Sequence, residues 1–272
     1  MLNIIRGDLY RLRKSRSFAY CLLGIVIVTL LSYVLVEWTM AVADGRTSGG
    51  AGGFNISINE PDIFSDMGSA EIMSEVASSK YAFIFFAIFV CVWITSEFGC
   101  GAIKNIVGKG CSKIKVFLAK YIVAIGIVYV LNVFTYVAVI LFGLIFNGTV
   151  NISKAFINDF FTYAILQTLL MIAYAGIVIT VSEIVRSTAV GIAVTMLIFI
   201  FSTKLMEVFD LLLNIFGLDV KISEYWIMGV VYDCYIGTID AGFVVKAIVV
   251  SVFWTALSLA IGMLHFKRTD IA

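Results

Sequence analysis

The chain contains several long stretches that carry almost no charged residues. The clearest of these stretches run over about 18–42, 81–96, 121–146, 160–181, 188–205 and 243–264. A helix of roughly 20 predominantly apolar residues is long enough to cross the hydrocarbon core of a bilayer. Only 14% of the 272 residues are charged, against about 25% in soluble domains. The sequence therefore predicts an all-α integral membrane protein with six spans, forming one domain over residues 1–272.

The residues before the first span have their own pattern. Leu2, Ile5, Leu9 and Leu12 recur at helical spacing, and arginines occupy other positions around the turn. This pattern favours an amphipathic helix over residues 1–17 that lies in the membrane interface, with its apolar side toward the lipid. The alternative is a basic flank that only fixes the orientation of the first span.

The distribution of basic residues predicts the orientation of the chain. Thirteen of the 19 lysines and arginines lie before the first span, in the second-to-third and fourth-to-fifth connections, or after the sixth span. Short loops rich in Lys and Arg stay in the cytosol. Both termini are therefore expected in the cytosol, and 44–79 and 206–242 outside. Within the second external segment, 208–218 is apolar but too short to cross, which favours an interfacial or re-entrant helix.

Catalytic motifs are not found. A phosphate-binding P-loop needs a glycine at position 103 and Ser or Thr after Gly108-Lys109, but the chain has Ile103 and Gly110 there. The spans contain no set of residues that would form a metal site or a nucleophile–base pair. We therefore expect no enzymatic activity, no bound cofactor or metal, and no nucleic-acid partner for this chain.

Polar residues inside the spans allow two interpretations. Asn132, Gln167 and Thr195 lie within the third, fourth and fifth apolar runs. They can bind a polar ligand, or they can hydrogen-bond between helices, which is the more frequent role at membrane depth.

The connection between the second and third spans, residues 97–120, is short and basic. It carries five lysines and one acid. It opens with EFGCG, continues with the amphipathic piece AIKNIV, turns at GKG and resumes with SKIK. A structured basic loop on the cytosolic side is a candidate docking surface for a cytosolic partner.

The opening of this loop resembles a known family. Residues 97–105 read EFGCGAIKN and are similar to the first cytosolic loop of type 2 ABC permeases, the membrane subunits of ATP-driven exporters. That loop often reads Glu-aromatic-x-x-Gly-Thr in the family, and here Ala102 replaces the threonine. The basic N-terminal helix, the six spans in order and the ending FKRTD extend the resemblance over nearly the whole chain.

The resemblance implies a function and a set of site residues. The family's loop forms a coupling helix that inserts into a groove of a separate ATPase subunit, which binds ATP and Mg²⁺. The fourth-to-fifth turn would be a smaller second contact through Glu183 and Arg186, and the N-terminal helix would be the interfacial helix of the family. The residues implied for the coupling loop are Glu97, Phe98, Gly101, Ile103, Lys104, Asn105, Ile106 and Val107, with Ile103, Ile106 and Val107 as apolar anchors.

The resemblance also implies partners. Two permease subunits, identical or siblings, would join two ATPase subunits in a bacterial cytoplasmic membrane. Similar short permeases export or clear antimicrobial peptides, which suggests an amphipathic peptide or another hydrophobic compound as substrate. The alternative from a different class is a non-transporting scaffold or sensor that anchors a cytosolic protein through the basic loop.

Overall fold

The computed structural model describes residues 2–43, 69–147, 154–215, 221–236 and 239–268. All regular secondary structure in these residues is helical, and six stretches are long and apolar enough to cross a membrane. The expected all-α fold with six candidate spans is therefore confirmed. The elements are α1 (Leu2–Lys14), α2 (Arg16–Ala43), α4 (Ser69–Ser78), α5 (Tyr81–Gly99), α6 (Ala102–Gly108), α7 (Lys113–Asn147), α8 (Lys154–Val185), α9 (Thr188–Ile215), the 3₁₀ turn η1 (Ser223–Tyr225), α10 (Ile227–Asp233) and α11 (Ala241–Arg268).

The spanning helices extend beyond the apolar runs. Helix α7 begins at Lys113, inside the segment expected as a loop. Helix α4 lies in the segment expected outside, but it buries Ile72, Met73 and Val76 in a small cluster with Tyr33 of α2. The second crossing stretch consequently runs from Ile72 to Gly99. Most of the external segment expected over 44–79 (residues 44–68) lies outside the described residues.

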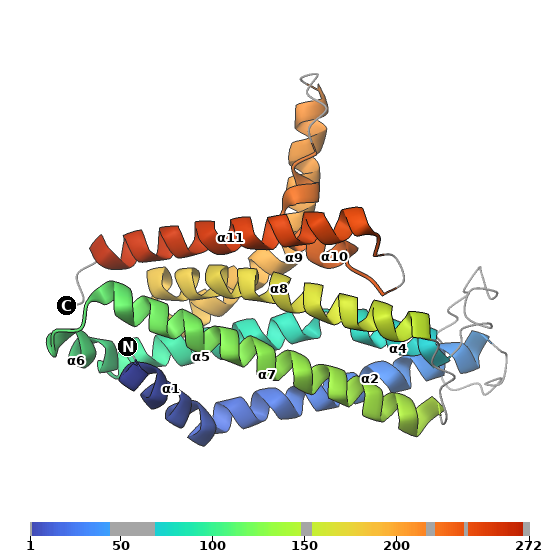
Figure 1. Cartoon of the computed structure of the whole chain (residues 1–272), viewed down its shortest axis with the longest axis horizontal. Coiled ribbons are helices and arrows are strands. Elements are labelled where there is room, and N and C mark those ends of the chain that lie inside the picture. Colours follow the sequence, from blue (N-terminus) through green and yellow to red (C-terminus); the bar gives the residue numbers. More distant parts are fainter. Residues whose placement is uncertain (1, 44–68, 148–153, 216–220, 237–238, 269–272) are drawn as a thin grey trace, which may run out of the picture.

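The helices form an elongated bundle in which both chain ends lie at the same end (Figure 1). Helix α1, helix α6 and the last turns of α11 gather there, and we call this the terminal end. Helix α4 and the beginnings of α8 and α11 lie toward the other end, which we call the distal end (Figure 1). Helices α5 and α8 are the most buried of the candidate spans, and α2, α9 and α11 are peripheral.

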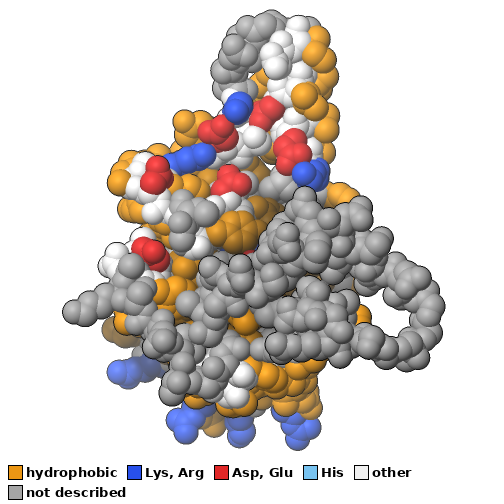
Figure 2. All heavy atoms as spheres, turned by 90° about the vertical axis from the view of Figure 1, so that its right-hand side faces the viewer, with side chains coloured by type: hydrophobic (Ala, Val, Ile, Leu, Met, Phe, Trp, Pro, Cys, Tyr) orange, Lys and Arg blue, Asp and Glu red, His pale blue; other side chains and the backbone are white. Residues whose placement is uncertain are grey.

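The C-terminal part of α9 leaves the bundle. It projects transverse to the other long helices (Figure 1), and its side chains are mostly exposed. The sequence suggested an interfacial or re-entrant helix over 208–218; in the structure, 208–215 continues the fifth span as one helix. Seen from the distal end, charged side chains gather on one side of this projection and on the segment after it (Figure 2). The projection is thus amphipathic, as a helix lying along a membrane surface is.

The packing of α7, α8 and α11 depends on a small residue. A Cβ added to Gly262 would lie 2.5 Å from Cζ of Phe117 and 2.7 Å from Oγ1 of Thr180. Small residues let helices approach closely in membranes, where packing supplies much of the association free energy. Gly262 therefore sets the distance of α11 from its two neighbours.

Two of the three polar residues noted within the spans hydrogen-bond to neighbouring helices. Nδ2 of Asn132 donates to Oγ1 of Thr168 at 3.2 Å, which joins α7 to α8. The hydroxyl of Thr195 hydrogen-bonds with Sγ of Cys91 at 3.7 Å, which joins α9 to α5. Gln167 is buried, and its Oε1 has no partner among the described residues. The interhelical role therefore holds for Asn132 and Thr195.

Candidate functional site

Two glycines position the short helix α6 at the terminal end. Gly101 and Gly110, on either side of α6, have φ of 66° and 86°. This left-handed backbone carries a steric penalty for residues with a Cβ, and glycine avoids it. The carbonyl of Gly101 accepts the N–H of Asn105 and so starts the helix. The glycines thus let the chain leave α5, form a separate helix and turn into α7.

Helix α6 turns its apolar side toward its own chain. Ile103 is only 2% exposed, and Ile106 and Val107 pack half-buried against the same core. Lys104 and Asn105 are exposed. A short amphipathic helix at the end of an apolar bundle gains most by burying its apolar side there. Of the three residues implied as anchors for a partner, Ile103 is therefore not accessible in this structure.

A buried group of charges lies between α1, α5 and α7, at the same end of the bundle as α6. Nζ of Lys120 on α7 is 2.8 Å from Oδ2 of Asp8 on α1 and forms an ion pair with Glu97 on α5. The same ammonium lies 4.9 Å from the centroid of the Trp93 ring. We call Asp8, Trp93, Glu97 and Lys120 the Lys120 cluster. It joins three helices at the terminal end.

The Lys120 cluster is almost free of water contact. The side chains of Lys120, Asp8 and Glu97 are 2%, 3% and 6% exposed. Buried ions lose hydration that only close partners can replace, so removing one partner is costly. The two carboxylates exceed the one ammonium in charge, and the more exposed Arg11, 3.9 Å from Glu97, compensates from the edge.

Sequence reasoning missed most of this cluster. It took Lys120 as a loop charge, gave no role to Asp8, and assigned Glu97 to partner binding. One signal was present: Asp8 stands four residues before Leu12 and so on the same side of α1. An acid on the buried side of a basic amphipathic helix indicates a buried cation opposite.

The turn between α8 and α9, expected as a second contact with a partner, contains one buried and one exposed residue of the expected pair. Glu183 is 3% exposed, which leaves it unavailable as a surface contact. Arg186 is exposed and has φ of 53°. Its guanidinium lies 5.3 Å from the centroid of the Phe98 ring. The structure therefore brings the turn between α8 and α9 next to the C-terminal end of α5, where the basic loop begins.

Helix α1 presents two different apolar surfaces. Leu12 is buried and Ile5 half-buried on the side that carries Asp8, and this side packs against the bundle. Leu2 and Leu9 are 71% and 50% exposed. Of the four apolar residues expected to face lipid, Ile5 and Leu12 thus pack against the protein, and Leu2 and Leu9 face the surroundings.

A groove of about 700 Å³ separates α1 from α5 and α6. Both apolar and polar side chains line it, among them Arg11, Glu97, Asn105 and Lys109. A concave surface with a few polar groups and both signs of charge can receive a side chain from a second protein. The groove and the exposed side of α6 together form the candidate site.

No protein-family model matches the chain, and no curated protein gives a significant match. The likeness to type 2 ABC permeases consequently depends on the sequence pattern alone.

Proposed function

We propose that the chain is the membrane-spanning permease subunit of an ATP-driven exporter. The observation that carries the proposal is helix α6, a separate short helix between two spans that exposes Lys104 and Asn105 at the end where both termini lie. A partner that moves α6 would act directly on α5 and α7, because only a few residues connect them. ATP binding and hydrolysis belong to the partner in this proposal.

The Lys120 cluster supports a mechanical role for this region. Glu97 is two residues before the end of α5, and Lys120 is in the third turn of α7. Their ion pair and the link to Asp8 connect the helices on both sides of α6 to α1. Motion of α6 would therefore be passed to α1, α5 and α7 together, and rigid-body motion of helices is a common form of conformational change.

The proposed substrate is an amphipathic peptide or another hydrophobic compound, and the proposed assembly contains two permease subunits. Both follow from the resemblance.

The test is co-purification of this chain with a candidate ABC-type ATPase subunit expressed together with it. Lys104→Glu with Lys109→Glu reverses two exposed charges on α6 and its C-cap, and is expected to abolish association. The matched control is Lys204→Glu with Lys221→Glu, which makes the same charge change at two exposed lysines of the projecting α9 and the segment after it. The control should retain the ATPase.

Two results would count against the proposal. One is that the ATPase does not associate with the unmodified chain. The other is that the α6 variant and the control retain the same amount of ATPase while both remain monodisperse. Substrate-stimulated ATP turnover in reconstituted vesicles separates an exporter from a scaffold, because a scaffold would bind its partner without that stimulation.

A further inference from the structure

The distal half of the bundle contains a groove between α7 and α8 that is unrelated to α6. Its volume is about 520 Å³, within the range of about 300–1,000 Å³ that small-molecule sites occupy. Tyr129, Val133 and Val137 of α7 line one side of it, and Phe161 and Ile165 of α8 line the other. These wall residues are exposed to the surroundings of the bundle. The groove therefore opens sideways, where a membrane protein meets lipid.

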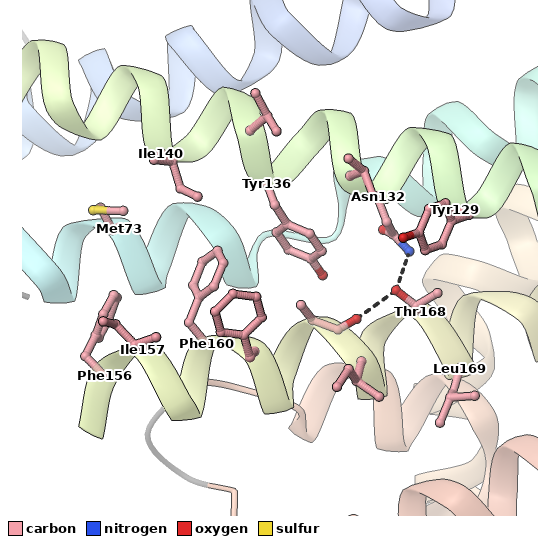
Figure 3. A pocket seen from close by; sticks show the side chains of 15 residues that line it. Met73, Tyr129, Asn132, Tyr136, Ile140, Phe156, Ile157, Phe160, Thr168 and Leu169 are labelled. Atoms are coloured by element: carbon pink, nitrogen blue, oxygen red, sulfur yellow. Dashed lines mark hydrogen bonds between the residues drawn. The ribbon is translucent and has the colours of Figure 1, made fainter. Parts of the chain in front are cut away.

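The floor of the groove is closed by protein. Tyr136 and Phe160 pack edge to face, with ring centroids 5.6 Å apart, and Met73 of α4 lies at the distal part (Figure 3). Asn132 and Thr168 meet across the floor through their hydrogen bond (Figure 3). The surface is therefore concave and apolar along most of its length, and its polar side-chain groups are the Asn132–Thr168 pair and the hydroxyls of Tyr129 and Tyr136.

The length and the position of the groove select its occupant. Tyr129 to Ile140 along α7 corresponds to about 16 Å of helix. One leaflet of a bilayer contributes about half of the ~30 Å hydrocarbon core, or about 15 Å. The lining residues begin near the distal end, at Ile140 and Ile157, and stop near the middle of the spans, at Tyr129 and Leu169. The groove is thus as long as one acyl chain and lies in one leaflet.

Surface chemistry points to the same occupant. The lining contains aromatic and branched apolar side chains, and no charged residue is among the described residues that line it. A charged or strongly polar ligand would lose its hydration there without compensation. We propose that this groove binds one acyl chain of a phospholipid from the leaflet at the distal end, with the chain terminus beside Asn132 and Thr168. The assignment does not depend on coupling to an ATPase.

Photolabelling tests the proposal on the full-length chain. The chain is reconstituted in nanodiscs of phosphatidylethanolamine and phosphatidylglycerol that contain a small share of a phospholipid with a diazirine on one acyl chain. Adducts after irradiation are located by mass spectrometry. Labelling of groove residues such as Val133 and Phe161 is expected to exceed, at least fivefold, that of Val245, Val249 and Val252, which are exposed on α11 toward the same end.

The position of the diazirine gives a second, independent readout. A group at the chain terminus should label near Tyr129 and Leu169, and a group close to the ester should label near Ile140 and Ile157. Labelling that ignores the position of the diazirine would contradict a chain held lengthwise.

Two variants fill the groove in different ways. Ala164→Trp enlarges a half-buried floor residue, and Val133→Trp enlarges an exposed wall residue, which keeps the test available if the first variant does not fold. Each should reduce groove labelling at least fivefold and leave the α11 residues unchanged. Equal labelling of groove and α11 would show annular lipid only. An unlabelled groove beside a labelled α11 would show that protein covers it. Either result overturns the proposal.

Discussion

The ammonium of Lys120 and the carboxylate of Asp8 lie 2.8 Å apart, although 112 positions separate them in the chain. This ion pair holds the N-terminal helix α1 against α7, and Glu97 completes it from α5. An ion pair in this place makes the position of α1 depend on residues that flank α6. The pair is therefore central to both the stability and the proposed coupling of the terminal end.

Removing the buried cation should destabilise the chain strongly. Lys120→Met leaves Asp8 and Glu97 buried without their common partner, and losing one member of a buried ion group costs about 3–5 kcal/mol. Lys115 lies on the same helix but is exposed, so Lys115→Met should change stability by less than about 0.5 kcal/mol. The measurement is the midpoint of thermal unfolding in detergent. Similar midpoints for the two variants would show that the cluster is hydrated.

Ile103 should behave as a core residue and not as a contact for a partner. Ile103→Ala removes apolar volume from a site that is 2% exposed, and such truncations cost about 2–5 kcal/mol. The neighbouring change Lys104→Ala, at an exposed position, should leave the unfolding midpoint unchanged and weaken ATPase binding. The reverse pattern, a stable Ile103→Ala variant that no longer binds the ATPase, would show that Ile103 contacts the partner.

Thiol labelling should reveal the side on which the terminal end lies. Cys100 is exposed beside α6. A membrane-impermeant maleimide should therefore label it in inside-out vesicles and spare it in intact cells, and Cys100→Ser serves as control. Labelling of Cys100 in intact cells would show that the terminal end lies outside the cell, opposite to the expected orientation. Cys111 is half-buried and should react more slowly.

Cys234 provides an internal reference at the distal end. Burial raises the pKa of its thiol to about 11, and the thiolate is the form that reacts. The thiol stays protonated below this pKa, so labelling at neutral pH should be negligible from either side and should rise only as the pH approaches 11. Rapid labelling near pH 7 would show that this part of the chain opens.

A methyl group added at Gly262 should weaken the packing of α11 against α7 and α8. Gly262→Ala places a Cβ against Phe117 and Thr180 at distances that require movement, and overpacking of this kind costs about 1–3 kcal/mol. Gly126 of α7 has no atom within 4 Å of the corresponding Cβ position, so Gly126→Ala is the matched control. The measurement is the midpoint of thermal unfolding in detergent, which should fall for Gly262→Ala and not for Gly126→Ala. An unchanged midpoint for Gly262→Ala would mean that Phe117 moves aside.

The class of the fold and the approximate places of the spans could be predicted from the amino-acid sequence. Long uncharged runs leave few alternatives in a bilayer, because every backbone polar group must be paired there and a helix pairs its own. The break at EFGCG and the glycines around α6 also marked that helix, since left-handed backbone at Gly101 and Gly110 is a local property. These features depend on residues close together in the chain.

Which side chains are accessible and which are paired depends on how the helices pack, and this could not be predicted from the sequence. The apolar side of α6 could face a partner or its own bundle, and the amphipathic pattern is the same in both cases. Asp8, Glu97 and Lys120 come from three helices, so their burial depends on how those helices pack. The groove between α7 and α8 likewise exists only because two separate helices leave space between them. Periodicity describes one helix at a time, and contacts between helices depend on their relative positions, which no single segment encodes.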